Sequence, residues 1–313
     1  MKTAIYRSYG DSEVLQYEDV DRPRPGPGQV LVKVAGTSFN PVDAGIRGGY
    51  LSEVFRISFP HVPGIDVAGT IAELGDGVDG WQIGDTVVGL LPMDTDGAAA
   101  DYVVAPADVL ASAPQTVPLA DAAALPTVGL TAWQALFEIA DLRAAQTILI
   151  NGAGGAVGGY AVQLAHHVGA IVTATTKPAS AQRLRSYGAD RLIDYIDYGA
   201  TPLTIEGQHF DVVLNLISTS PEETAALASL VADGGFFVGT MTSGPDDPQR
   251  GLRAQRIFVR SDAAQLADLV ARVDTGQLRI DVADRRPLSD IAAVHDAADA
   301  GRLPGKTILV PAD

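Results

Sequence analysis

The sequence contains no cysteine among its 313 residues. Disulfide bonds, thiolate metal sites and a cysteine nucleophile are therefore excluded. It also has only five histidines, and the adjacent pair His166 and His167 cannot face one site from the same helix. We therefore expect no catalytic metal ion.

Positive charge and long apolar runs are also scarce. The 22 Lys and Arg residues are outnumbered by 38 Asp and Glu, giving a net charge of −16, which disfavours nucleic-acid binding. Glycine, proline or charge interrupts every apolar run before the roughly 20 residues that a membrane helix needs, and no signal-like segment is apparent at the N-terminus. We expect a cytoplasmic protein, since 47% hydrophobic residues suffice for a substantial core.

A glycine-rich stretch runs from Thr147 to Gly158. An apolar strand, Thr147 to Ile150, leads into glycines spaced three apart, and apolar residues then recur at helical spacing. This layout is typical of a dinucleotide-binding turn, in which the backbone approaches the pyrophosphate at the helix N-terminus. The alternative is an ordinary glycine-rich loop before a helix. The predicted pyrophosphate contacts are Gly152, Gly155, Ala156, Val157 and Gly158.

The end of the next predicted strand, Ala170 to Ala174, indicates which dinucleotide is bound. An NAD-binding fold usually has an acidic residue about 20 residues after the first glycine, where it binds the ribose hydroxyls. This sequence has Thr175, Thr176 and Lys177 instead, with Arg183 and Arg185 nearby. Hydroxyls and cations suit a 2′-phosphate, so we expect NADP (as NADPH), although a solvated helix start with ordinary surface cations is the alternative.

The periodicity changes along the chain and predicts an α/β protein with two domains. Short strands separated by glycine and proline fill the region before Pro118, and strands then alternate with helices, which indicates a parallel sheet. The last stretch, from Gln277, is expected to rejoin the first region. The predicted domains are 1–120 with 277–313, and 121–276, with the cofactor in a cleft between them.

Several phrases, in family order over nearly the whole chain, resemble the zinc-free quinone oxidoreductase branch of the medium-chain dehydrogenase/reductase superfamily. They are SFNPVDAGIRG, FPHVPGIDVAGTI, GDTVVG, ALPTVGLTAWQAL, NGAGGAVGGYAVQLA, GADRLIDY and GKTILV. The resemblance implies a GroES-like β-barrel domain joined to a Rossmann doubly wound sheet, NAD(P)H as the hydride donor and a homodimer.

The departures from the zinc enzymes of that superfamily concern the metal ligands. Asn40, Ile65 with Asp66, and Thr127 stand where those enzymes have their ligands, and the four-cysteine lobe is missing. Without a Lewis acid, the substrate must already accept hydride readily. The prediction is NADPH-dependent reduction of a quinone. The alternatives are reduction of an α,β-unsaturated carbonyl compound, and NADPH binding without turnover in a redox-responsive protein.

Three residues are predicted to act on the substrate, each with a structural alternative. Asn40 can donate from its amide to a developing oxyanion or to the cofactor, or it is a turn residue before Pro41. Tyr50 offers a phenol as a proton donor, or lies in a surface loop. Thr127 can bind the nicotinamide, or cap a helix. Asp43 and Asp66 are expected to be structural, by pairing with Arg47 or capping backbone groups.

The remaining predicted cofactor contacts lie at later strand ends, where folds of this type bind ligands. Tyr195 resembles a residue at the adenine–ribose end in relatives, or is a core tyrosine. The others are Ile217, Gly239 and Val259. A predicted strand from Ile257 to Val259 is a candidate sheet edge for pairing across a twofold axis.

Overall fold

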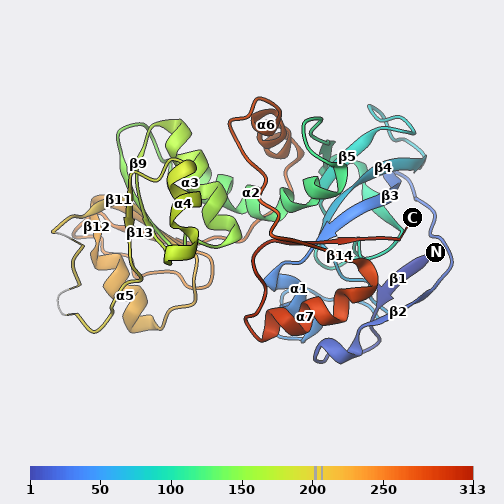
Figure 1. Ribbon diagram of the computed structural model, residues 1–313, viewed down its shortest axis with the longest axis horizontal. Coiled ribbons are helices and arrows are strands. Elements are labelled where there is room, and N and C mark those ends of the chain that lie inside the picture. Colours follow the sequence, from blue (N-terminus) through green and yellow to red (C-terminus); the bar gives the residue numbers. More distant parts are fainter. Residues whose placement is uncertain (201–202, 206, 313) are drawn as a thin grey trace. The chain divides into compact units, whose positions relative to one another are not determined.

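The computed structural model describes residues 1–200, 203–205 and 207–312 (Figure 1). The chain forms two compact units, Met1–Thr127 with Arg260–Asp313, and Val128–Val259. The first unit is discontinuous in sequence, and the chain returns to it at residue 260 rather than 277. Helix α6 (Ala263–Asp274) accounts for this difference, because it contacts strand β7 and its Asp274 accepts hydrogen bonds from Gln115 and Thr116.

The first unit is built on a seven-stranded sheet in the order β14-β15-β3-β4-β5-β7, with β6 also paired to β3. All pairs are antiparallel except β14 with β15. A separate antiparallel pair joins β1 to β2. The strands are β1 (Lys2–Ile5), β2 (Gln16–Asp19), β3 (Gln29–Ser38), β4 (Asp66–Leu74), β5 (Thr86–Leu90), β6 (Tyr102–Pro106), β7 (Leu110–Ser112), β14 (Asp284–Pro287) and β15 (Thr307–Val310).

Alternation along β3 directs one row of side chains into the core of this unit. Val30, Val32 and Val34 pack with Val67 and Val87 in one apolar cluster. Helices α1 (Pro41–Arg47) and α7 (Ile291–Asp299) contact each other, and buried Arg47 of α1 donates to His295 and pairs with Asp299 of α7. The short 3₁₀ segments of the unit are 12–14, 107–109, 119–124 and 288–290.

The second unit is a parallel six-stranded sheet in the order β10-β9-β8-β11-β12-β13. This order, with β8 in the middle and the chain winding outward both ways, is that of a Rossmann dinucleotide-binding fold. The strands are β8 (Thr147–Asn151), β9 (Ile171–Thr175), β10 (Arg191–Ile193), β11 (Phe210–Asn215), β12 (Val231–Gly239) and β13 (Arg253–Arg256).

The helix predicted after the glycine-rich stretch is confirmed, since α3 begins directly after Gly155. Figure 1 shows α3 and α4 running beside the sheet, with α5 at its lower end. A π-helical segment, Gln134–Ile139, directly follows α2. The helices are α2 (Pro126–Trp133, which starts in the first unit), α3 (Ala156–Val168), α4 (Pro178–Ser186) and α5 (Pro221–Ser229).

The predicted strand Ile257–Val259 is wrong. The edge strand is β13, which ends at Arg256, and the backbone N–H of Ile257 donates to the carbonyl of Gly239 beyond it. The sequence of β13, Arg-Ala-Gln-Arg, alternates between exposed and half-buried positions. An edge strand of this kind has few apolar residues, so hydrophobic patterning predicts a strand at the neighbouring apolar residues instead.

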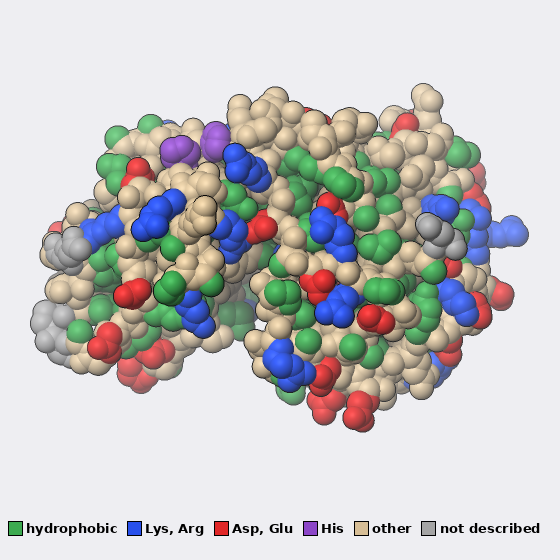
Figure 2. Space-filling view, in the orientation of Figure 1, with side chains coloured by type: hydrophobic (Ala, Val, Ile, Leu, Met, Phe, Trp, Pro, Cys, Tyr) green, Lys and Arg blue, Asp and Glu red, His purple; other side chains and the backbone are tan. Residues whose placement is uncertain are grey.

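Charges of both signs are mixed over the face shown in Figure 2, where Lys and Arg stand singly or in small groups among Asp and Glu. The described part of this face therefore has no continuous basic surface of the kind that follows a nucleic-acid backbone. Among the described residues, no helix is long and apolar enough to cross a membrane.

Candidate functional site

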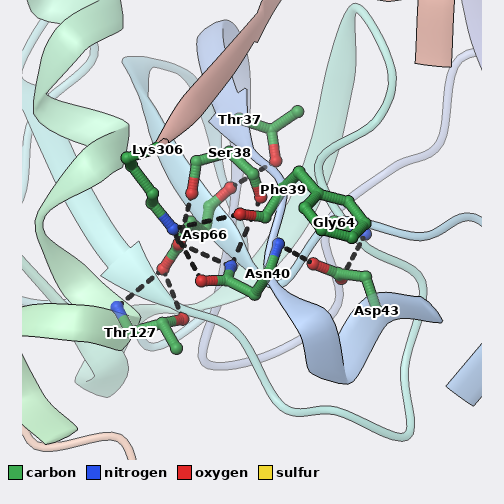
Figure 3. Close-up of polar contacts among 9 residues, drawn as sticks. All are labelled: Thr37, Ser38, Phe39, Asn40, Asp43, Gly64, Asp66, Thr127 and Lys306. Carbon is green, nitrogen blue, oxygen red and sulfur yellow. Dashed lines mark hydrogen bonds and ion pairs between the residues drawn. The ribbon is translucent and has the colours of Figure 1, made fainter. Parts of the chain in front are cut away.

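A buried polar cluster surrounds Asp66 at the start of β4 (Figure 3). The Asp66 side chain is fully buried. Its Oδ1 accepts hydrogen bonds from the backbone N–H and the hydroxyl of Thr127, at 2.8 and 2.7 Å. Its Oδ2 accepts from Ser38 Oγ, Asn40 Nδ2 and Lys306 Nζ, at 2.5, 2.8 and 3.2 Å. Five donors thus satisfy a carboxylate that water does not reach.

Lys306 brings the only cation into this described cluster, and the sequence analysis did not single it out. It directly precedes β15, and its side chain is 3% exposed. Its Nζ donates to Asn40 Oδ1 at 2.6 Å, to Asp66 Oδ2 at 3.2 Å and to the carbonyl of Phe39 at 3.3 Å. Burial lowers the pKa of Lys306, and the attraction of Asp66 opposes that effect. The only sequence feature that could have indicated this role is the position of the lysine directly before the apolar strand Thr307–Val310.

Asn40 stands at the N-cap of α1, where its φ and ψ of −129° and 149° are extended. Its amide donates to Asp66 Oδ2 at 2.8 Å and to the carbonyl of Ser38 at 3.3 Å, and its Oδ1 accepts from Lys306. The 3.3 Å contact is at the long end for a hydrogen bond. Asn40 is therefore a turn residue before Pro41, as one alternative expects, and its side chain also belongs to the polar cluster.

Asp43 caps backbone groups. Its two carboxylate oxygens accept from the backbone N–H groups of Asn40 and Gly64, at 2.9 and 3.2 Å. Burial raises the pKa of Asp43 to about 6, helped by the nearby charge of Asp66 and opposed by the two hydrogen bonds. The pairing with Arg47 considered for it is not what the structure shows, because Arg47 pairs with Asp299.

The other two predicted catalytic residues have opposite environments. Thr127 lies in the first turn of α2, is 7% exposed and donates its hydroxyl to Asp66. Tyr50 follows α1 and is 84% exposed. The structure therefore brings Asn40 and Thr127 together on one carboxylate, and leaves Tyr50 outside that cluster.

The glycine turn between β8 and α3 has the geometry that phosphate binding requires. Gly152 has a φ of +86°, which favours glycine, and Gly155 is an N-cap residue that has no side-chain cap. The first-turn N–H groups of Ala156, Val157 and Gly158 have no partner within the helix. A Cβ on Gly158 would lie 2.5 Å from the backbone of Ala153, so this glycine allows the helix to approach the turn that precedes it closely.

A chain of buried side chains holds this turn at the carboxyl ends of the strands. The backbone N–H of Gly152 donates to Thr175 Oγ1 at 2.8 Å, and Thr175 donates to Asn151 Oδ1 at 3.1 Å. Asn151 in turn donates to Asn215 Oδ1 at 2.9 Å. The sequence predicts Thr175 at the 2′-phosphate, whereas in the structure its side chain is fully buried and accepts from the backbone N–H of Gly152. Asn151 and Asn215 were missed because they continue apolar strands.

The predicted adenosine-phosphate residues gather where β9 and β10 end. Thr176 is 6% exposed and its hydroxyl donates to the carbonyl of Lys177, whose side chain is exposed. Lys177 Nζ lies 5.3 Å from the ring centre of Tyr195, which is 58% exposed. Tyr195 is therefore not a core residue. Arg183 donates to the carbonyl of Gly154 at 2.6 Å, beside the glycine turn.

The last three predicted contacts differ in exposure. Ile217 is 40% exposed and packs against Gly152, where an added Cβ would lie 2.7 Å from its Cγ2. Gly239 is buried at the end of β12, and Val259 is half-buried. Ile217 thus lines the turn directly, and Gly239 ends the neighbouring strand.

Among the residues that the structure describes, no group of three or more His, Asp or Glu side chains is arranged to hold a metal ion. The oxygen-rich cluster around Asp66 instead contains the ammonium of Lys306.

Comparisons with known proteins match both parts of the chain. The family described as "Alcohol dehydrogenase GroES-like domain" matches residues 26–115, and "Zinc-binding dehydrogenase" matches residues 187–309. The chain is 32% identical to a chloroplast envelope quinone oxidoreductase homolog of Arabidopsis thaliana, over 99% of this chain and 98% of that protein. It is 30% identical to an NADPH-dependent alkenal/one oxidoreductase of the same plant, over 99% and 80%.

A solved structure gives the same answer for the fold. The quinone oxidoreductase from Coxiella burnetii superposes with a TM-score of 0.87 at 27% identity, over 99% of each chain. The GroES-like and Rossmann folds expected from the sequence are thereby confirmed.

Proposed function

Because the chain belongs to the quinone oxidoreductase branch of the medium-chain dehydrogenase/reductase superfamily, and is thus an oxidoreductase, we propose that it reduces a quinone with NADPH, without a metal ion. The glycine turn at the N-terminus of α3, after the central strand of a parallel sheet, is the observation that supports cofactor binding most directly. When bound, NADPH supplies the hydride.

The second unit fits the pyrophosphate of such a cofactor. Three helix N–H groups, those of Ala156, Val157 and Gly158, have no intrahelical acceptor, and the helix dipole adds a partial positive charge at that end. Gly155 has no side chain that would cover them. The Thr175 hydroxyl fixes the backbone N–H of Gly152 beneath the turn, so the turn is formed before any ligand arrives.

We propose NADPH rather than NADH because cations, and no carboxylate, follow β9. Lys177 is exposed and lies against Tyr195, a ring that can also stack on adenine. Thr176 and Lys177 are the residues we propose for the 2′-phosphate. Thr175 has the separate task of holding the glycine turn.

The position of Lys306 supports our proposal that the reaction needs no metal ion. Its ammonium donates to two of the oxygens, Asn40 Oδ1 and Asp66 Oδ2, that a divalent ion in this cluster would need. A metal ion could not share those oxygens with an ammonium 2.6 and 3.2 Å away, because the like charges repel. The substrate must then be a good hydride acceptor, as quinones are.

At the reacting end we propose Asn40 and Thr127. The Asn40 N–H that now contacts the Ser38 carbonyl at 3.3 Å is the weaker of its two donor contacts, and an oxyanion is the stronger acceptor for it. The Thr127 hydroxyl donates to Asp66, so toward the nicotinamide it acts as an acceptor. The exposed phenol of Tyr50 is our candidate for proton donation.

Reduction of an α,β-unsaturated carbonyl compound is the second candidate. The relative named as an alkenal/one oxidoreductase supports it. The same donors would stabilise an enolate oxygen, and a proton must then reach the α-carbon. We also propose a homodimer, joined through the open edge at β13.

The test is a steady-state comparison of quinones with enals, using NADPH and NADH, after treatment with EDTA. We expect turnover of quinones with NADPH that EDTA does not reduce. Rapid enal turnover with inert quinones would reverse the order of the two candidates. Tight NADPH binding without oxidation by any acceptor would instead favour a binding protein without catalysis.

A further inference from the structure

We propose that Lys306 is a positioning residue, whose ammonium fixes the Asn40 amide in the one orientation that presents an N–H to the reacting oxygen. This inference builds on the proposed function, and it assigns a task to a side chain that would otherwise be only a buried cation.

The distances around Asn40 allow only one orientation of its amide. Lys306 Nζ is 2.6 Å from Oδ1, while Nδ2 is 2.8 Å from Asp66 Oδ2. Rotating the amide by half a turn would place its NH2 against the ammonium and its oxygen against the carboxylate. Both contacts would then be repulsive, between two donors and between two acceptors. Lys306 and Asp66 therefore act as a pair, the ammonium on the amide oxygen and the carboxylate on the amide nitrogen.

The contacts of Lys306 also show that Asn40 is its principal partner. An ammonium has three donors, and Lys306 uses them on Asn40 Oδ1, Asp66 Oδ2 and the Phe39 carbonyl. The contact to the amide is the shortest, at 2.6 Å, against 3.2 and 3.3 Å for the other two. A residue serving only to neutralise Asp66 would be expected to lie closest to that carboxylate.

The charges of the cluster explain why a cation is needed for this task. Two buried carboxylates flank Asn40, since Asp66 accepts from its side-chain amide and Asp43 from its backbone N–H, and the ammonium of Lys306 pairs with Asp66 alone among them. A neutral side chain at position 306 would leave Asp66 as the only charged partner of that amide. The amide would then keep its contact to Asp66 but lose the group that opposes rotation on the oxygen side.

The absence of cysteine from the chain permits a direct test. In the Lys306→Cys variant the new thiol is unique, so unfolded protein can be alkylated there and refolded. Bromoethylamine restores an ammonium on a side chain of lysine length, and bromopropane gives a neutral side chain of the same length. The two products differ only in an ammonium against a methyl group. Wild-type protein carried through the same treatment is the control.

We expect the aminoethyl product to recover kcat to within about threefold of the treated wild type. The propyl product should lose about 10²-fold in kcat, the size of effect that follows loss of one oxyanion donor. Its Kd for NADPH, measured by fluorescence, should change by less than about threefold, since the glycine turn lies in the other unit. Wild-type kcat in the propyl product would overturn the proposal.

A second readout is independent of turnover. The side-chain NH2 resonances of Asn40, assigned by their loss in Asn40→Asp, should be sharp and slow to exchange in the aminoethyl product and broadened in the propyl product. Identical resonances in both products would also overturn the proposal. If wild-type protein binds NADPH but reduces no acceptor, the proposed function fails, and these resonances still decide the role of Lys306.

If neither product refolds, the double variant Asp66→Asn with Lys306→Met removes both charges together, which avoids leaving one buried charge unpaired. Low kcat with near-wild-type Kd for NADPH supports the positioning role, and wild-type kcat overturns it.

Discussion

Replacing Gly158 by alanine tests the close approach of α3 to the glycine turn. A Cβ at this position would lie 2.5 Å from Cα and O of Ala153, against 3.4 Å for the shortest ordinary contact. The obstacle is backbone, so the helix itself must move by about 0.9 Å. Gly159, the next residue, offers a matched control, because its added Cβ would make only ordinary contacts with side chains, to the Tyr187 ring at 3.5 Å and to Arg183 Nη1 at 3.7 Å.

The two substitutions should have opposite effects. Alanine is favoured over glycine inside a helix by about 1 kcal/mol, and both variants gain this. Overpacking a tight site costs about 1–3 kcal/mol. Gly159→Ala should therefore be neutral or slightly stabilising, whereas Gly158→Ala should lose up to about 2 kcal/mol of unfolding free energy. The displaced helix N-terminus should also weaken NADPH binding by about tenfold, or 1.4 kcal/mol.

Chemical denaturation and fluorescence titration with NADPH measure the two quantities on the same samples. The contrast between neighbouring variants is the critical result. If Gly158→Ala has the same free energy of unfolding and the same Kd for NADPH as Gly159→Ala, then the helix does not approach the turn as closely as described. Phosphate binding at this helix would then have less support.

Three further outcomes are expected. Burial lowers the pKa of His295 from 6.5 to about 3. As pH drops, the unfolded chain therefore binds this proton first, and the free energy of unfolding falls between pH 6.5 and 3, by at most roughly 5 kcal/mol. Urea unfolding at a series of pH values should show a shallower fall in His295→Asn, whose amide oxygen can still accept from Arg47. Thr175→Val leaves the Gly152 N–H without its acceptor and should cost about 1–3 kcal/mol and weaken NADPH binding, which thermal melts and titration would detect. Tyr50→Phe should change stability by less than about 0.5 kcal/mol, since the side chain is exposed; an unchanged kcat would remove Tyr50 as the proton donor.

The regular parts of the fold could be predicted because their signal is local. The helical periodicity after Gly155 predicts α3 as it is found, and the predicted strand Thr147 to Ile150 lies within β8. The strands β1, β2 and β7 and the helix α1 were missed. They are short, and their formation depends on partners farther along the chain. In the pair of β1 with β2, for example, Lys2 lies opposite Asp19.

The candidate site was predictable only in part, for the same reason. Asn40 and Thr127 could be identified from family phrases, but their joint attachment to Asp66 depends on a contact across 61 residues. Lys306 meets Asp66 across 240 residues. A sequence pattern reports on near neighbours along the chain, so a network closed by tertiary contacts shows only as isolated polar residues.

The discontinuity of the first unit has a consequence for how the protein is made. Synthesis proceeds from the N-terminus, so every residue of Val128–Val259 has left the ribosome before Lys306 is translated. The second unit can then fold while the first unit still lacks one of its strand pairings, that of β15 with β3. Nascent chains stalled shortly before residue 306 should accordingly bind NADPH if the proposed function is right, while the cluster around Asn40 still lacks the ammonium that balances Asp66.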